Sequence, residues 1–365
     1  MKQLLLVGAG LAHLHIIKQL RQTNLPDTEV TLISPSPIHY HAGLFSGFAE
    51  GIDALDDISL AIEPLTEAAQ ATFLQDAVLS IDPNTKQVLT QTGRVLSFDL
   101  ISFNNGTLTG ETNITGARES ALTIKPDYRF PEVIDKVRTQ GELSIVGDDK
   151  MTIELAGAIK AWRHRHHVTE PVRILANGRL LANHHPNISS KIEKHLGKMG
   201  IECWLDTPIQ EVYLNGVQAK TGQTIPHDHL LWLMNDKAMD MFRKAKLPTD
   251  QNDYLLIENT LQVKKYPYIF AVGRTATINQ HPNHSLSAMD PLQMGELLWQ
   301  NIKGYLTNGE GYVFEPSMEI QTTISLGQKK ACLINKNKVS ISRRLWAVHH
   351  RHQRHILSQI KRGDV

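Results

Sequence analysis

Short apolar runs alternate with segments of helical periodicity along most of the chain. Residues 3–7 (QLLLV) form an apolar run that ends at a glycine turn, which is typical of a buried strand. Apolar residues about three positions apart then predict a helix over 11–21, and the β-branched stretch at 29–33 predicts a second strand. Strand, glycine turn, helix and strand in this order indicate a βαβ unit of a parallel sheet.

The same pattern returns in the middle of the chain. A strand is predicted at 143–147, a helix at 153–162 and a strand at 172–175. A further buried strand at 268–273 ends in glycine. Turn signals between shorter apolar runs predict two hairpins, at 87–98 and 212–217. Two βαβ units in one chain indicate an α/β protein with two Rossmann-like domains.

Composition and charge narrow the class of protein. The 365 residues are 41% hydrophobic and 21% charged, which suits two domains with sizeable cores. The 38 Lys and Arg against 37 Asp and Glu argue against nucleic acid as a partner. No stretch approaches the roughly 20 apolar residues of a spanning helix, so we expect a soluble or peripheral protein. The two cysteines form no disulfide framework, which favours a reducing cytoplasm.

A glycine-rich turn follows the first predicted strand. Gly8 and Gly10 take the first two glycine positions of a dinucleotide-binding turn, and His13 stands at the third. Such a turn lets a pyrophosphate approach the backbone at a helix N-terminus, and an ordinary tight turn is the alternative. Ser34 ends the second strand where a carboxylate would hold the adenosine ribose, so it offers one hydrogen bond without the charge.

The 18 histidines are abundant, but their spacing does not indicate a metal site. His13 and His15 lie on an apolar helix, where histidines are usually packed and hydrogen-bonded. The remaining clusters match no HExxH or zinc-finger spacing and are expected on solvated surface: 164–167, 184–185, 227–229 and 349–355. We therefore predict no metal.

The order of these landmarks resembles the type II NADH dehydrogenases and related flavoproteins. It is most similar to the flavin modules fused to selenide, water dikinase in some bacteria. The matching stretches cover nearly the whole chain and include VGAGLAHLHII, VTLISPSPIHYHAGLFSGFAEG, FDLISFNNGT, LLANHHPNISSKIEKHLGKMGIE and LQVKKYPYIFAVGRTAT. This resemblance implies a two-domain fold that binds flavin adenine dinucleotide (FAD) and NAD(P).

The resemblance also implies which positions contact FAD. Its pyrophosphate would lie against Gly8, Gly10 and His13. Further along the chain it implies adenine contact at Ala77 and Val78, a glycine turn beside the flavin at Gly106, the interdomain linker at Lys125, and the ribitol-binding pair at Gly273 and Arg274. Arg274 replaces an aspartate, and arginine donates hydrogen bonds but cannot accept them, although it can reach a phosphate. We expect FAD to be retained; a site that no longer binds anything is the alternative.

The second unit departs further from the resemblance. Gly147-Asp148-Asp149-Lys150 replaces the glycine-rich turn for the nicotinamide nucleotide. A carboxylate about 4 Å from a phosphate charge costs on the order of 4 kcal/mol at an effective dielectric near 20. The strand that ends at Leu175 is followed by no carboxylate for a ribose, and Asn235 replaces a small turn residue. NAD(P)H is therefore expected to bind poorly.

Sulfide:quinone reductases share the implied architecture but need a pair of redox cysteines beside the flavin. Cys203 and Cys332 lie in predicted apolar strands and are expected to be buried small hydrophobic residues. Sulfide chemistry is therefore not expected.

The C-terminus combines cations with apolar residues. No acidic residue interrupts the series Arg343, Arg344, Arg351, Arg354, Lys361 and Arg362. A basic helix that carries Leu345 and Trp346 can lie on an anionic membrane surface. Docking on its own protein or on a second subunit stays equally open.

Taken with the resemblance, these patterns predict an α/β protein with one Rossmann-like domain inserted in the other. The predicted parts are an FAD-binding domain (1–115 and 251–320), an NAD(P)-binding-like domain (116–250) and a C-terminal segment with the basic helix (321–365). The expected function is that of an FAD-dependent oxidoreductase, which passes electrons from a small-molecule donor to a quinone-like acceptor. We expect it in the cytoplasm or peripherally on the inner face of the cell membrane, with a homodimer left open. The alternative is a non-catalytic, nucleotide-responsive or scaffold protein that kept the fold.

Overall fold

A computed structural model describes residues 1–110, 114–234, 236–280, 290–307, 311–315 and 322–361. Its first domain is built on an eight-stranded sheet in the order β22-β19-β20-β21-β9-β1-β2-β5. The strands are β1 (Lys2–Val7), β2 (Thr28–Ser34), β5 (Thr72–Gln75), β9 (Leu100–Phe103), β19 (Leu255–Ile257), β20 (Gln262–Val263), β21 (Tyr266–Ala271) and β22 (Ala276–Ile278). The five strands from β21 to β5 are parallel. Strands β1 and β9 from the first third of the chain and β21 from the last third thus pair in one sheet.

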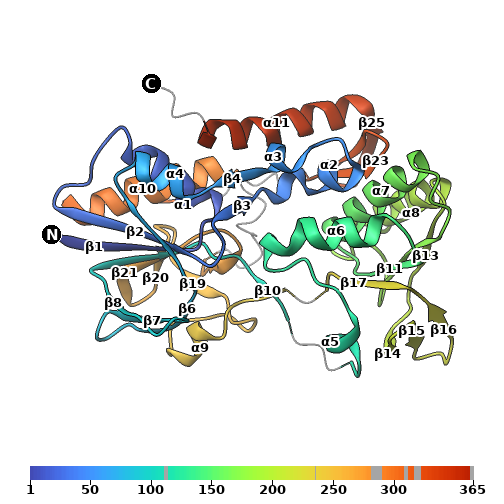
Figure 1. Cartoon of the computed structure of the whole chain (residues 1–365), viewed down its shortest axis with the longest axis horizontal. Coiled ribbons are helices and arrows are strands. Elements are labelled where there is room, and N and C mark those ends of the chain that lie inside the picture. The colour runs from blue at the N-terminus through green and yellow to red at the C-terminus, as the bar shows by residue number, and fades with distance from the viewer. Residues whose placement is uncertain (111–113, 235, 281–289, 308–310, 316–321, 362–365) are drawn as a thin grey trace.

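Helices cover the first sheet on one side. α1 (Leu11–Leu20) packs against α10 (Pro291–Thr307) and α4 (Glu63–Ala68). On the other side in Figure 1 lie a three-stranded sheet of β6 (Val78–Asp82), β7 (Gln87–Thr90) and β8 (Val95–Ser97) and the short α9 (Met241–Lys244). The strand β9 is buried at all four positions, because a central parallel strand is covered on both faces.

The inserted domain has a four-stranded parallel sheet in the order β13-β12-β11-β17. Its strands are β11 (Leu143–Val146), β12 (Val172–Leu175), β13 (Ile201–Trp204) and β17 (His229–Trp232), and its helices are α6 (Phe130–Arg138), α7 (Lys150–Arg165) and α8 (Pro186–Lys198). The predicted hairpin near residue 215 is present in a second, antiparallel sheet: β14 (Ile209–Tyr213), β15 (Gly216–Ala219) and β16 (Thr224–Pro226). The second predicted βαβ unit is confirmed as β11, α7 and β12, with the two strands parallel. The helix α7 is three residues longer at each end than predicted.

Short elements connect the two domains. The linkers carry β10 (Leu108–Thr109), α5 (Ala117–Ser120), η2 (Asp127–Arg129) and β18 (Asp236–Lys237), and the excursion after β2 carries β3 (Ile38–Tyr40), η1 (Ala42–Leu44), α2 (Phe45–Glu50), α3 (Leu55–Ile58) and β4 (Ser59–Ala61). A short η3 (Gly273–Thr275) follows β21. The linker strands β10 and β18 pair antiparallel, and α2 packs on α6 and α7. The domains thus meet through both linkers and through α2 (Figure 1).

The C-terminal segment extends across both domains. It comprises β23 (Thr322–Gly327), β24 (Lys330–Asn335), β25 (Lys338–Ser342) and α11 (Arg343–Lys361). The strand β23 packs on α7, where Ser325 N donates to the buried Glu154 Oε1 (2.9 Å). The helix α11 then runs back over the first domain to contact α1, α3 and η1 (Figure 1). Among the residues described, no helix is both long and apolar enough to cross a membrane.

Candidate functional site

The turn between β1 and α1 lies at the carboxyl edge of the first sheet, where no side chain of the described residues caps the helix. Gly8 has φ +91°, and a Cβ there would lie 2.6 Å from the backbone nitrogen of Asn105, so only glycine fits. Gly10 is the N-cap of α1 and makes no side-chain capping hydrogen bond. The first amides of an uncapped helix are free to bind an anion. This end of the site therefore fits a pyrophosphate.

The side chain of His13 lies on the other side of that turn, inside the protein. Nδ1 lies 2.7 Å from the Gly8 carbonyl, and Nε2 lies 2.8 Å from the Ser102 hydroxyl. A carbonyl can only accept, so Nδ1 carries the proton and Ser102 donates to Nε2. Burial lowers the pKa of His13 to about 4, so the ring is neutral. The expectation that His13 cradles a phosphate is corrected for its side chain, which ties the turn to β9 instead.

We predict that His13 makes the protein less stable in acid. Its pKa is lowered from 6.5 to about 4 in the folded state, so the unfolded chain binds the proton more readily. The stabilisation is complete above pH 6.5 and is lost as the pH falls toward 4, at about 1.4 kcal/mol per pH unit. Urea unfolding of wild type and His13→Gln at several pH values tests this. Between pH 4 and 6.5 the free energy of unfolding of the variant should depend less steeply on pH, by the slope that corresponds to one bound proton. Equal slopes for the two proteins would contradict the assignment.

The adenosine end of the predicted site offers few contacts. Ser34 is buried, and its hydroxyl donates to the Ser36 carbonyl (3.1 Å), so its oxygen can accept but its proton is already used. Val78 is buried in β6, opposite Thr90. The N–H of Ala77 donates to Asp76 Oδ1 (2.8 Å) and its carbonyl accepts from Gln91 (2.7 Å). The backbone groups expected near an adenine at Ala77 are therefore engaged within the protein.

A charged cluster from four segments lies where the two domains meet. Lys125 forms an ion pair with Asp236 and donates to the Thr107 hydroxyl (2.8 Å). Arg274 lies 3.1 Å from Asp127 and 3.9 Å from Asp236. Burial, and then the charge of Arg274, lower the pKa of Lys125. Two cations and two carboxylates thus balance within the cluster, and a phosphate contact of Arg274 would compete with its ion pair to Asp127.

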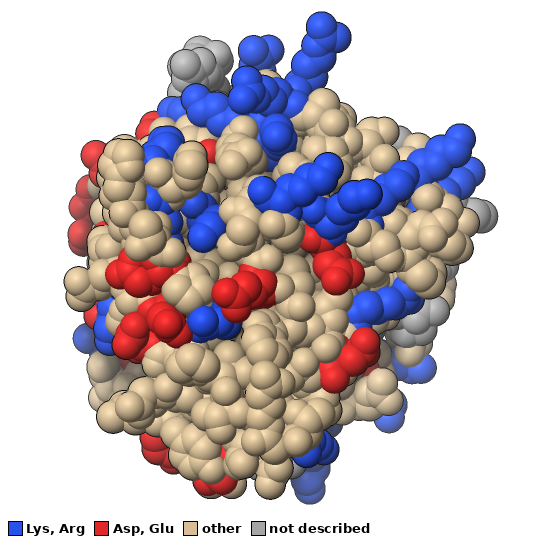
Figure 2. Space-filling model, turned by 90° about the vertical axis from the view of Figure 1, so that its right-hand side faces the viewer, with Lys and Arg blue, Asp and Glu red and all other residues tan. Residues whose placement is uncertain are grey.

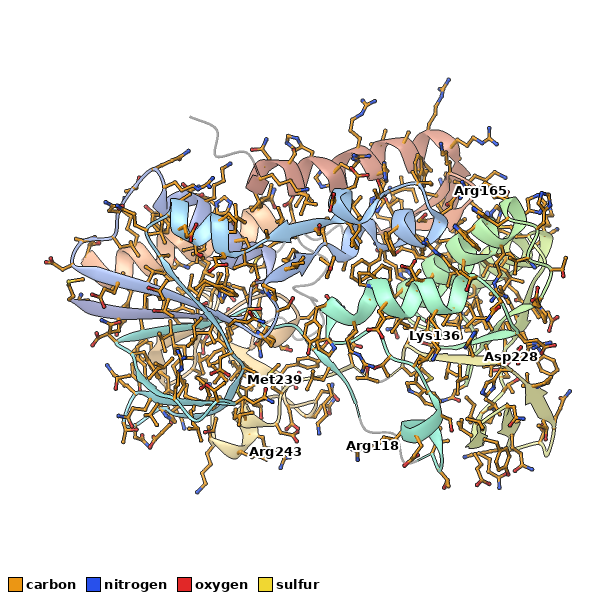
Figure 3. All side chains as sticks on the ribbon, in the orientation of Figure 1. Arg118, Lys136, Arg165, Asp228, Met239 and Arg243 are labelled. Carbon is orange, nitrogen blue, oxygen red and sulfur yellow. The ribbon has the colours of Figure 1, made fainter. Side chains whose placement is uncertain are left out.

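The remaining predicted residues border this cluster. Gly106 has φ +68° and faces open space, so its backbone conformation is what favours glycine there. Gly273, at φ +67°, begins η3 directly after β21. Asn105, beside Gly106, points to the linker before α9: its Nδ2 lies 2.7 Å from the sulfur of Met239, which Figure 3 labels. The structure thus brings Gly106, Lys125, Gly273 and Arg274 together at one edge, while Val78 lies on a separate sheet.

Sequence reasoning missed three residues of this edge: Asn104, Asp127 and Asp236. Asp127 lies two positions after Lys125, but Asp236 is more than a hundred residues away. No local pattern signals an ion pair between such distant positions. The only available signal was the unusual arginine at 274, because a partly buried guanidinium needs carboxylate partners.

The N-terminus of α7, in the second unit, is closed by its own side chain. Asp149 Oδ1 accepts from the Thr152 backbone N–H and from the Thr152 hydroxyl, both at 2.9 Å. This is an N-cap in which a carboxylate takes the donors that a phosphate would need. Burial, and then the charge of Asp149, raise the pKa of Asp148. The prediction that aspartates obstruct this turn thus has a structural basis.

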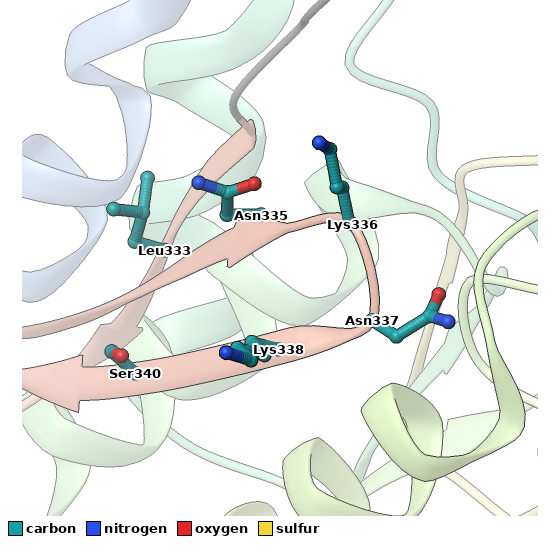
Figure 4. Close-up of a pocket in the computed structure, with 6 residues that line it drawn as sticks. All are labelled: Leu333, Asn335, Lys336, Asn337, Lys338 and Ser340. Carbon is teal, nitrogen blue, oxygen red and sulfur yellow. The ribbon is translucent and has the colours of Figure 1, made fainter.

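Little space is present between the domains beside this turn. A cavity of about 30 Å³ is lined by residues of both linkers, of the turn before α7 and of η3, among them Lys125, Asp149, Met234, Asp236 and Arg274. Asn235, which sequence reasoning singled out, lies outside the described residues. A surface cavity of about 430 Å³ lies elsewhere, on the β24–β25 hairpin (Figure 4). None of the predicted site residues lines it.

The cysteines lie outside this edge, and of the histidine clusters expected on the surface, 164–167 is exposed whereas His227 is buried. Burial raises the pKa of Cys203 to about 11 and that of Cys332 to about 12, so both are protonated thiols. They lie in different sheets, on β13 and β24. In the part of the chain that the structure describes, no three His, Cys, Asp or Glu side chains are arranged to hold a metal ion.

Residues 2–290 match the pyridine nucleotide-disulphide oxidoreductase family, and the chain belongs to that family. It is therefore an FAD-dependent, NADH dehydrogenase-like oxidoreductase by family, which confirms the fold class and the enzyme class expected from the sequence. Proteins of this family and its structural neighbours bind FAD and NAD(P)H.

Particular relatives are similar over most of their length. A type II NADH:quinone oxidoreductase of Staphylococcus saprophyticus is 23% identical over 89% of this chain and 88% of its own. The sulfide:quinone oxidoreductase of Aquifex aeolicus superposes with a TM-score of 0.80 at 17% identity, covering 100% and 92% of the two chains. NDH2 of Plasmodium falciparum, solved with NADH, superposes with a TM-score of 0.74 at 14% identity, covering 98% and 97%. At these identities the structural likeness shows the fold alone.

Proposed function

We propose that this chain binds FAD at the carboxyl edge of its eight-stranded sheet and passes electrons to a quinone-like acceptor. The observation that carries the proposal is the uncapped N-terminus of α1 behind the Gly8–Gly10 turn, which faces the glycine turn at Gly273. Ligands of parallel α/β sheets bind at this edge, where strand ends and helix N-termini meet. FAD, when bound, supplies the redox chemistry; the chain's residues supply binding and orientation.

Different groups of the chain would contact different parts of FAD at that edge. The α1 amides would hold the pyrophosphate, and the Ser34 oxygen would accept from the ribose. Lys125, with Thr107 and Asp236, lies at the domain boundary beside the predicted flavin turn, where its ammonium group can donate a hydrogen bond. Relatives named NADH:quinone and sulfide:quinone oxidoreductases support a quinone-like acceptor. Family membership favours this reading over a non-catalytic scaffold.

We predict that purified protein is yellow and releases FAD on denaturation, and that Gly10→Glu yields colourless, folded apo protein. The glutamate side chain would fill the approach to the α1 amides and place a negative charge there. Chromatography of the released cofactor and the 450 nm absorbance per protein measure both. Gln223→Glu, at an exposed site in the inserted domain, adds the same single negative charge and is the control. A colourless wild type that takes up no added FAD would refute the proposal.

The C-terminal helix is docked on the first domain along one face. Ile356, Leu357 and Ile360 are buried, and His350 lies 2.8 Å from the buried carboxylate of Asp53. Arg354 pairs with Asp53 (3.3 Å) and Asp57 (2.6 Å), so the cations expected to be uncompensated are in part paired. This face of α11 therefore packs on the protein's own first domain. Arg362 lies outside the described residues.

The opposite face of α11 remains exposed and basic. Arg343, Arg344 and Arg351 are exposed there around Val348, which is 70% exposed. Figure 2 shows Lys and Arg side chains gathered along the upper edge of the molecule, where α11 and the β24–β25 hairpin lie in Figure 1. This arrangement supports contact with an anionic membrane surface and hence a peripheral location. A second subunit on the same face is the competing occupant.

We predict that Arg343→Glu, Arg344→Glu and Arg351→Glu together abolish binding to vesicles containing anionic lipid. Each cation near such a surface contributes about 1 kcal/mol, and the effect is screened by salt. The substitutions leave the docked face of α11 intact, whereas truncation would uncover Ile356. Lys191→Glu, Lys220→Glu and Lys244→Glu, which change the net charge equally on other surfaces, are the control. Equal vesicle co-sedimentation of both triple variants would exclude this surface, and a change in molar mass alone would point to the subunit contact.

A further inference from the structure

Asn104 is the first residue after β9, at the centre of the sheet's carboxyl edge. The register places Phe103 beside Val7 of β1 on one side and Ala271 of β21 on the other. The Asn104 N–H donates to the Val7 carbonyl (2.8 Å), and the Val272 N–H donates to the Phe103 carbonyl (3.0 Å). Its side chain therefore emerges between the glycine turn that starts α1 and the glycine turn that starts η3.

The orientation of this side chain follows from its partner. Asn104 Nδ2 donates to the Val272 carbonyl (3.1 Å), and since a carbonyl can only accept, the amide nitrogen must face β21. The amide oxygen then faces α1. Oδ1 is buried and accepts no hydrogen bond from any residue that the structure describes. Most buried polar atoms have a hydrogen-bond partner, so this unused acceptor calls for an explanation in the packing around it.

Both glycine turns lack a side chain where the Asn104 amide lies. A Cβ on Gly10 would overlap the amide oxygen and would lie 2.7 Å from the Asn104 backbone oxygen, and a Cβ on Gly273 would lie 2.7 Å from Nδ2. Gly10 has φ −67° and ψ 159°, a conformation that any residue adopts, so its backbone does not require glycine. Asn104 requires it instead, most closely through its side-chain amide and also through its backbone oxygen. This differs from Gly106, whose Cβ would meet nothing within 4 Å.

We propose that Asn104 is a positioning residue of the FAD site, wedged between the two glycine turns so that it sets their separation. The absence of a side chain at Gly10 and Gly273 then leaves room for the Asn104 amide as well as for the ligand. The inference rests on the proposed binding of FAD at this edge. Asn104 acts on the cofactor through the turns that it holds apart.

Reciprocal substitution tests the wedge. Gly10→Ala should lower Tm by about 5 °C, because overpacking costs a few kcal/mol, and should weaken FAD binding at least tenfold. Gly10→Ala combined with Asn104→Ala should be more stable and bind FAD more tightly than Gly10→Ala alone, but the recovery should be partial, because the Asn104 carbonyl oxygen still lies 2.7 Å from the added Cβ. Gly10→Ala with Asn104→Leu keeps the branched shape and should recover neither. Tm is read from thermal unfolding and FAD affinity from fluorescence titration of apo protein.

The outcomes separate this inference from the proposed function. A double alanine variant as unstable as Gly10→Ala would overturn the wedge. Recovery of Tm without recovery of FAD affinity would overturn its role in positioning the cofactor, since the bare Cα of Gly10 would then be needed by the ligand. If wild type binds no FAD, the proposed function fails, and the Tm values alone decide whether Asn104 holds the turns apart.

Discussion

Replacing Asp149 and Thr152 together by glycine should raise the affinity for NADH at least tenfold. In wild type the Asp149 carboxylate occupies the α7 N-terminus and accepts both the backbone N–H and the hydroxyl of Thr152. A nucleotide phosphate would have to displace this cap and tolerate its charge, which costs on the order of 4 kcal/mol at 4 Å before screening. Even about a third of that is a factor of ten in affinity. Titration calorimetry and stopped-flow flavin reduction measure the change.

The neighbouring aspartate provides the control for this prediction. Asp148→Gly removes one negative charge from the same turn but leaves the Asp149 cap in place, so it should improve NADH binding far less. Glycine within the first turn of α7 destabilises the helix by about 1 kcal/mol, which thermal unfolding can monitor. Fast flavin reduction of wild type by micromolar NADH would show that the nucleotide avoids the aspartates. It would also show that the second unit binds NADH despite its altered turn.

Arg163→Met should destabilise the inserted domain by about 4 kcal/mol. The side chain is fully buried, and its nitrogens donate to five backbone carbonyls: Val137 (2.8 Å), Arg138 (3.3 Å), Gln140 (3.3 Å), Glu170 (3.2 Å) and Pro171 (3.3 Å). The first three belong to the end of α6 and the turn after it, whose carbonyls have no intrahelical partner. Burial lowers the pKa of Arg163, but these carbonyls surround its guanidinium with acceptors. Removing the donors leaves several buried carbonyls unsatisfied, at about 1–3 kcal/mol each.

Arg165→Met is the matched control, because Arg165 lies two residues further along α7, is exposed and donates to one carbonyl, that of Glu50. It should change the free energy of unfolding by less than about 1 kcal/mol. Arg163→Lys, with three donors in place of the guanidinium fork, should fall between the two. Urea unfolding followed by far-ultraviolet circular dichroism measures all three. Equal stability of Arg163→Met and Arg165→Met would contradict the role assigned to Arg163.

The secondary structure around both glycine turns could be predicted from the sequence because its determinants are local. The apolar run at residues 3–7 becomes β1, buried at its last four positions, and α1 begins at Leu11 directly after the turn. Asp149 could likewise be recognised as an obstruction, since a carboxylate at a helix N-terminus acts on amides two or three residues away. Neither conclusion depends on which strands become neighbours.

Residues distant in sequence could be assigned only from the tertiary structure. His13 looked like part of a phosphate turn, but the fold places Ser102 of β9 beside its ring, and burial then keeps the imidazole neutral. Arg274 looked free to bind a phosphate, but the meeting of the two domains brings Asp127 and Asp236 to it. Such contacts depend on strand order and domain insertion, which no local pattern specifies.

The two glycines of the first turn illustrate the difference between what the sequence determines and what only the tertiary structure determines. The sequence by itself determined that a strand, a tight turn and a helix occur at residues 2–20, because hydrophobic periodicity and glycine act over a few residues. The structure decided why Gly10 has no side chain, since the side-chain amide and the backbone oxygen of Asn104, more than ninety residues away in the sequence, both lie too close for a Cβ. Close packing between parallel strands makes a residue's role depend on its neighbour in the sheet as much as on its neighbour in the chain.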